Sequence, residues 1–243
     1  RDFYSSLDAT NGIESAVAAA GVVKGEVAAG AGRPSMETGF HALLDTAVLH
    51  THPIVPNIIT CCQTGPELFA QLCHDLPPES RWIPYRQPGH ELTFEISRVL
   101  KTMPDAGGER IFFLQNHGVI VSAPSVESAQ LLYRQLVSLT TRFLERQAGQ
   151  VLPVWRQDAW DLRRYFVKGH PFLTPDEAVF CSDLEHFSYP ESDVMDVAGS
   201  IAYILETQKV LGLTPLYLTD HEADRILDME SEKYRQRQAG RML

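Results

Sequence analysis

The sequence predicts an α/β fold in which layers of helices cover a sheet. Strand-like and helix-like signals alternate along the 243 residues, as expected when each helix buries its apolar stripe against a sheet. A second observation is the run of β-branched and aromatic residues over 111–122, interrupted at Asn116–Gly118. The third is a long amphipathic helix expected over Ser125–Gln147, whose leucines recur at helical spacing and indicate a core or subunit contact.

The other elements follow from local signals in chain order. Ser35 is a cap candidate for a helix over 36–44, and a proline marks another helix that begins near residue 56. Thr174 and Thr219 each begin a capping box, in which a Thr and a Glu three residues later bond to each other's backbone amides. Further helices are expected over 13–23, 67–75, 93–103, 155–168 and 194–211, and strands over 47–53, 81–85 and 215–218.

Composition predicts one domain with neither nucleic acid nor membrane as a partner. Residues 1–243 are interpreted as a single domain, in which 152–243 form a helical C-terminal extension. The formal net charge of −10 argues against binding to phosphate backbones, and no apolar stretch approaches the length of about 20 residues that spans a bilayer. Four cysteines make no disulfide framework in so long a chain, which favours a reducing cytoplasm.

Three histidines are candidates for a metal site. His50 and His52 lie two apart in the strand-like segment AVLHTHP, so their imidazoles project from the same side. His117 follows the apolar run IFFLQ and precedes Gly118, where the backbone can turn or approach a neighbour closely. If the two strands are neighbours, three imidazoles converge and leave a fourth position open, as in catalytic zinc sites. Glu37, just ahead of the first strand, is the carboxylate expected to face that position.

The blocks SMETGFHALL, VLHTHP and FLQNHGVIV, in this order, resemble the class II aldolase/adducin family over roughly residues 33–146. RPSMET, IPYRQPG and FLTPDEAVFC also resemble the aldolase domain of rhamnulose-phosphate aldolase/alcohol dehydrogenase proteins. The resemblance implies a three-layer α/β/α fold with a central, mainly antiparallel sheet. It also implies a homotetramer, because active sites of the family lie at subunit contacts.

The resemblance implies roles for the candidate residues. Carried over by position, Glu37 is the acid/base, and His50, His52 and His117 bind zinc, with manganese or cobalt as substitutes. The implied activity is that of a lyase, an aldolase that cleaves a sugar phosphate or related hydroxyketone through a metal-stabilised enediolate. Partial desolvation is expected to raise the pKa of Glu37 toward neutrality. His41, four residues after Glu37, is either an orienting partner or part of the helix packing.

The resemblance also leaves alternatives open. An epimerase, dehydratase or decarboxylase uses the same kind of metal scaffold, and an adducin-like module is not catalytic. All three ligand candidates are present, which counts against the module, and Glu37 favours an aldolase over an epimerase. The sugar-phosphate aldolases of the family that this sequence resembles carry a Gly/Asn/Ser-rich phosphate loop before the S-x-E block, but the first 33 residues contain no GN-x-S element. Either this region has been lost, or it is missing from the given numbering, or the substrate is bound without this phosphate contact. Tyr217 and Tyr234 are equal candidates for a proton donor.

Overall fold

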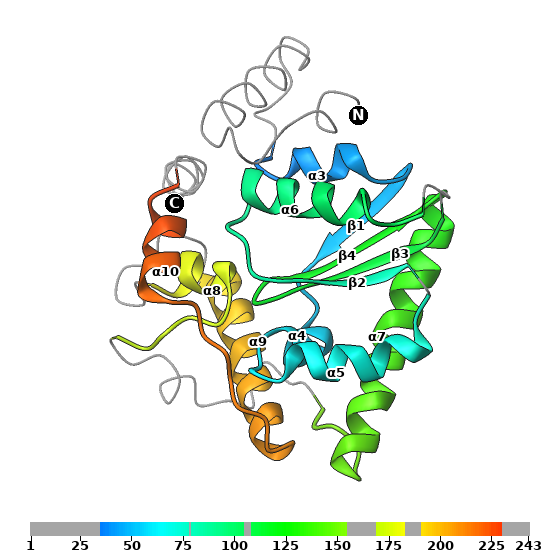
Figure 1. The fold of residues 1–243 in the computed structure, drawn as a ribbon. Coiled ribbons are helices and arrows are strands. Elements are labelled where there is room, and N and C mark those ends of the chain that lie inside the picture. Colours follow the sequence, from blue (N-terminus) through cyan, green and yellow to red (C-terminus); the bar gives the residue numbers. More distant parts are fainter. Residues whose placement is uncertain (1–34, 78, 105–107, 155–168, 183–190, 230–243) are drawn as a thin grey trace.

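A mixed four-stranded sheet forms the centre of the protein (Figure 1). The structure, a computed structural model, describes residues 35–77, 79–104, 108–154, 169–182 and 191–229. The strands run in the order β1-β4-β3-β2. Their bounds are Ala47–Thr51 (β1), Ser80–Ile83 (β2), Arg110–Leu114 (β3) and Gly118–Ala123 (β4).

The direction of the strands departs from the expectation. β4 pairs antiparallel with both β1 and β3, whereas β2 pairs parallel with β3. The sheet is therefore mixed, and the expectation of a mainly antiparallel sheet was wrong. The physical reason is the helix α6 (His90–Leu100), which joins β2 to β3 as a crossover and so returns the chain in the same direction. The strand expected over 215–218 is reduced to an isolated bridge between Cys62 and Pro215.

Helices cover both faces of the sheet, which gives the three-layer α/β/α arrangement (Figure 1). Along β3, Ile111 and Phe113 face one apolar core while Phe112 and Leu114 face another, because successive side chains point to opposite faces. The smaller core lies under α3 and α6, and the larger one under α4, α5, α7 and α9. The helices not yet given are α3 (Thr38–Leu43), α4 (Ile54–Thr60), α5 (Gly65–Leu72), α7 (Val126–Ala148), α8 (Pro175–Cys181), α9 (Glu191–Val210) and α10 (Asp220–Leu227).

Most predicted helices occur, and their ends follow capping chemistry. α7 begins after Ser125, whose hydroxyl accepts from the Ser128 amide, and ends at Gly149 with a φ of 63°. The capping box at Thr219 is confirmed. At Thr174 the hydroxyl caps the helix as expected, but the Glu177 carboxylate accepts from the Leu173 amide. The helices expected over 13–23 and 155–168 lie outside the described residues.

The C-terminal segment, residues 169–182 and 191–229, packs against the end of the sheet that carries the histidines. α9 lies against α4, α8 against α9, and α10 against α8. Side-chain and backbone bonds join the segment to α4: the Gln208 amide donates to the Ile58 and Cys61 carbonyls, and the Leu216 amide donates to that of Cys61. In the described part of the chain, no helix is both long and apolar enough to cross a membrane. That residues 1–243 form one domain with an extension stays a prediction.

Candidate metal centre

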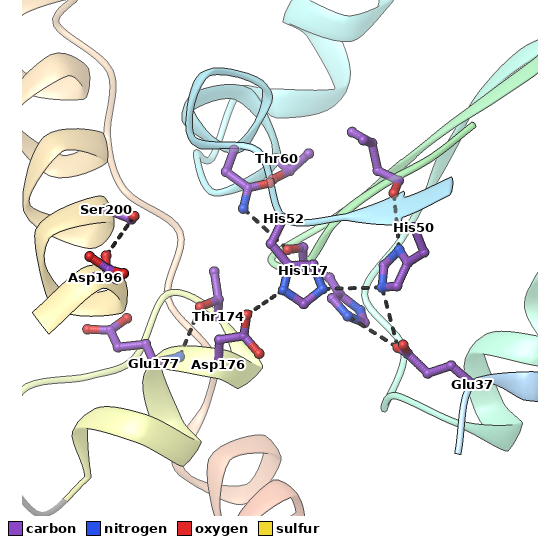
Figure 2. A network of polar contacts seen from close by, with 12 residues as sticks. Glu37, His50, His52, Thr60, His117, Thr174, Asp176, Glu177, Asp196 and Ser200 are labelled. Carbon is purple, nitrogen blue, oxygen red and sulfur yellow. Dashed lines mark hydrogen bonds and ion pairs between the residues drawn. The ribbon is translucent and has the colours of Figure 1, made fainter. Parts of the chain in front are cut away.

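The three predicted histidines lie together at one end of the sheet (Figure 2). His50 is in β1, His52 lies one residue beyond the end of that strand, and His117 is in the turn between β3 and β4. The Nε2 atoms of His50 and His52 are 3.2 Å apart, and one nitrogen from each of the three rings lies within 4.8 Å of the others. The alternation of side chains along β1 therefore placed both imidazoles on one side, as expected.

The turn that carries His117 depends on its two neighbours. Asn116 has a φ of 53°, in the left-handed region that asparagine tolerates better than most residues. Gly118 lets β1 approach this turn, since a Cβ there would lie 2.4 Å from the Thr51 carbonyl oxygen and 2.7 Å from the His52 ring. The sequence indicated this close approach, and the structure shows that the end of β1 makes it.

Hydrogen bonds fix which nitrogen of two rings is available as a ligand. His50 Nδ1 is 3.0 Å from the Val119 carbonyl oxygen, which can only accept, so Nδ1 carries the proton. His52 Nδ1 is hydrogen-bonded to the Asp176 carboxylate in the same sense. Both Nε2 lone pairs are therefore directed toward each other at 3.2 Å. Two lone pairs at this distance repel unless a proton or a cation lies between them.

The donor set fits a divalent cation. Ligand nitrogens about 2.0–2.1 Å from a tetrahedral zinc lie about 3.3 Å from one another, close to the spacing between His50 and His52. His117 is suited to the same role because burial, followed by the neighbouring charges of His52 and His50, lowers its pKa well below the usual value. The ring therefore stays neutral and keeps a lone pair for a metal. Its Nδ1 is buried without a hydrogen-bond partner among the described residues.

Glu37 faces the cluster, as the sequence predicted. Its Oε1 lies 3.5 Å from Nε2 of both His50 and His117 (Figure 2). Burial raises the pKa of Glu37, but its close contact with His50 and the neighbouring rings of His52 and His41 outweigh burial, and the pKa is lowered. The expected rise toward neutrality was therefore wrong, because several imidazoles surround this carboxylate.

A small cavity of about 70 Å³ opens beside the cluster. Glu37, His52, His117 and Asp176 are polar residues of its lining. The apolar part of its wall combines residues from both halves of the chain: Met36, Pro88, Pro175, Val179, Ile226 and Met229. This volume holds only a few water-sized groups, so it suits the reacting end of a small molecule.

Asp176 is the residue at this site that sequence reasoning missed. It lies 124 positions from His52, in the first turn of α8, and no sequence motif singled it out. The block FLTPDEAVFC, which resembled the family, was the one signal that could have pointed to it. Figure 2 shows its carboxylate directed at the His52 ring.

The other candidates do not face the cavity. His41 stacks on Phe40, with ring centroids 4.7 Å apart, which supports the packing alternative. Tyr217 packs edge-on against His170 at 5.6 Å, and burial raises its pKa. Neither His41 nor Tyr217 lines the cavity. Tyr234 lies outside the described residues.

Comparison with known proteins gives one match. The family model described as the class II aldolase and adducin N-terminal domain matches residues 4–141, more than half of the chain. This range includes Glu37 and all three histidines but ends before α8. No curated protein and no solved structure matches the chain.

Proposed function

Because the chain belongs to the class II aldolase and adducin family, we propose that it is a metal-dependent aldolase that cleaves a small hydroxyketone. The observation that carries the proposal is the joint placement of three imidazole ligands and one carboxylate around a single point. A scaffold with no reaction to perform has no need of three converging imidazoles, one of them buried, beside a glutamate whose pKa is lowered.

In this mechanism the chain supplies both a binding set and a proton carrier. His50, His52 and His117 would hold a divalent cation, and its charge would stabilise the negative charge that develops on the substrate as the carbon–carbon bond breaks. Glu37 moves the proton. Since its pKa is lowered, it is a carboxylate at neutral pH and can accept a proton from the substrate hydroxyl as the aldehyde leaves. It then returns the proton to the reacting carbon of the other fragment.

We infer an unphosphorylated hydroxyketone rather than a sugar phosphate from the cavity lining. Besides the two histidines, the polar residues of the described lining are Ser35, Glu37 and Asp176, and the others are apolar. The charged side chains among them are the carboxylates of Glu37 and Asp176. No lysine or arginine is among the described residues that line it. Among the described lining residues, a phosphate placed there would meet two negative charges and no arginine or lysine donor.

The finer expectations belong to the same proposal. Zinc is the proposed ion, with manganese or cobalt as substitutes, because a site of three imidazoles accepts several first-row metals. A homotetramer is proposed because active sites of the family lie at contacts between subunits. A cytoplasmic location is supported by the four cysteines, which are all free thiols.

The test combines metal content with turnover. Purified protein should contain about one zinc per chain, and a panel of hydroxyketones with and without phosphate should show aldehyde release from the unphosphorylated members. Glu37→Gln should lower kcat by a factor of about 10² to 10⁴ while zinc stays bound. Glu67→Gln, an exposed first-turn glutamate of α5, is the matched control and should keep full activity.

Two results would overturn the proposal in different ways. Full turnover by Glu37→Gln would remove the proton-transfer role and direct attention to an epimerase, dehydratase or decarboxylase on the same scaffold. Protein without zinc and without turnover would leave a non-catalytic adducin-like module.

A further inference from the structure

A side chain from outside the matched range 4–141 reaches the histidine cluster. Asp176, in the first turn of α8, accepts a hydrogen bond from His52 Nδ1 (Figure 2). We propose that Asp176 is a positioning residue that fixes His52 as a metal ligand, so that the C-terminal segment completes the metal centre. The inference rests on the proposed function, because it assigns a partner to one of the proposed ligands.

His52 differs from the other two histidines in how it is held. The side chains of His50 and His117 are 7% and 4% exposed, whereas that of His52 is 31% exposed. His50 is also held by the Val119 carbonyl and by the edge of the Phe40 ring. His52 lies beyond the last residue of β1, so strand pairing does not hold its backbone. It is therefore the ligand whose ring orientation depends most on a side-chain partner.

The position of Asp176 is itself determined by the turn that carries His117. The Asn116 side-chain amide donates to the Leu173 carbonyl at 2.9 Å. One residue later the Thr174 hydroxyl caps α8, and the buried Glu177 carboxylate accepts from the Leu173 amide. Asn116 directly precedes His117. These bonds therefore set the position of Asp176 relative to His117, while Asp176 itself contacts His52.

The contact has a specific chemical consequence. A carboxylate on Nδ1 holds the proton there and leaves the Nε2 lone pair directed at His50 and His117. Its negative charge also makes the imidazole a stronger donor to a cation, and such partners change metal affinity by about 10- to 100-fold. A first-turn acid that only complements the helix dipole has no such effect on a ligand.

The chain offers a matched control for that simpler role. Asp220 is a first-turn acid of α10, which also begins after a capping threonine, and it is exposed and does not line the cavity. Asp176→Asn keeps an oxygen that can accept from His52 but removes the charge, whereas Asp176→Ala removes both. Asp220→Asn removes a comparable first-turn charge elsewhere on the segment.

The experiment measures zinc affinity of the full chain by competition with a chromophoric chelator, and the visible spectrum of the cobalt-substituted protein. We expect zinc binding to weaken about 10-fold in Asp176→Asn and up to about 100-fold in Asp176→Ala, with Asp220→Asn within twofold of the wild type. The cobalt bands should shift in the Asp176 variants alone, which a purely structural role in α8 would not produce.

The possible failures are distinguishable. If the wild type binds zinc and Asp176→Asn binds it equally well with an unchanged cobalt spectrum, the positioning role is wrong and the proposed function stands. If Asp220→Asn weakens zinc binding as much as Asp176→Asn, the effect belongs to helix charge and the role is also wrong. If the wild type binds no metal, both proposals fall. Should Asp176→Ala fail to fold, Asp176→Asn decides alone.

Discussion

The sheet half of the molecule, residues 35–141, and the C-terminal segment, residues 169–229, contribute to the site in different ways. The sheet half supplies all three proposed ligands and Glu37, from a strand, a hairpin turn and a segment covering the sheet. The C-terminal segment supplies one carboxylate and much of the apolar wall, and side-chain bonds to backbone carbonyls attach it to the sheet half.

This difference teaches where the site is rigid and where it can vary. Ligands set by strand pairing move only if the sheet moves, whereas a segment joined by a few hydrogen bonds can open at a lower free energy. We therefore expect metal binding to depend mainly on the first region, with the Asp176 contact adjusting its affinity, and the shape of the substrate pocket to depend more on the second. The following variants test this division, from the largest expected effect to the smallest.

Removing two ligands from the sheet half should abolish metal binding. His50→Ala combined with His52→Ala leaves one imidazole, so zinc affinity should fall by more than about a thousandfold. Metal content per chain after dialysis is the measurement. The control pairs His74→Ala with His221→Ala, two exposed histidines outside the site. Zinc retained by the first double variant would show that the ion is held elsewhere, and the comparison of the two regions would lose its basis.

The C-terminal segment should give the protein a pH-dependent stability through Glu177. This carboxyl is fully buried, and burial raises its pKa to about 8 from an ordinary 4.5, although the Leu173 and Thr174 amides oppose the shift. Because the folded pKa is the higher one, the stabilisation is complete below about 4.5 and is lost as pH rises through about 8. The loss is about 1.4 kcal/mol per pH unit, so on the order of 4 kcal/mol between pH 5 and 8.

Urea unfolding of the metal-free protein across this pH range is the measurement. Glu177→Gln is neutral and keeps an oxygen for the Leu173 amide, so it should flatten the profile and be more stable than the wild type at pH 8. Glu191→Gln, an exposed acid in the first turn of α9, should leave the profile unchanged. If the stability advantage of Glu177→Gln over the wild type does not grow from pH 5 to 8, the sign of this prediction is wrong.

Gly118→Ala tests how tightly the sheet half is closed around the ligands. The new Cβ would overlap the Thr51 carbonyl oxygen at 2.4 Å, so β1 must shift, at a cost of about 3 kcal/mol. His52 moves with β1, and zinc binding should weaken as well. In the C-terminal segment, no atom of the described residues lies within 4 Å of the Cβ position at Gly199 of α9, so Gly199→Ala should be neutral or stabilise by about 0.5–1 kcal/mol. Equal effects of the two variants would contradict the division.

The sequence predicted the sheet half of the site better than the C-terminal half. His50 and His52 share a side because strand alternation is a local rule, and Gly118 marked the close approach at His117. Asp176 could not be found in this way, since its pairing with His52 across 124 residues depends on how α8 packs. The same holds for the parallel pairing of β2 with β3, and for the lowered pKa of Glu37, which depends on how many imidazoles surround it.

Asn116 links the sheet half to the C-terminal segment. Its replacement should make the C-terminal segment open more readily and leave the stability of the sheet unchanged. Its amide donates to the carbonyls of Leu173 and Leu216, so Asn116→Gly removes both bonds while it tolerates the φ of 53°. We expect a loss of about 2 kcal/mol, measured by hydrogen exchange as faster opening around Leu173 and Leu216 with unchanged protection in β3 and β4.

A second substitution at Asn116 separates the lost donors from the altered backbone. Asn116→Asp keeps the shape and the preference for the left-handed conformation, but it places carboxylate oxygens against two carbonyl oxygens. It should therefore loosen the same segment more than Asn116→Gly does, because repulsion replaces two favourable bonds. If both variants instead lower protection equally across the sheet and the C-terminal segment, the two regions open as one unit, and Asn116 is part of the core and not a junction between them.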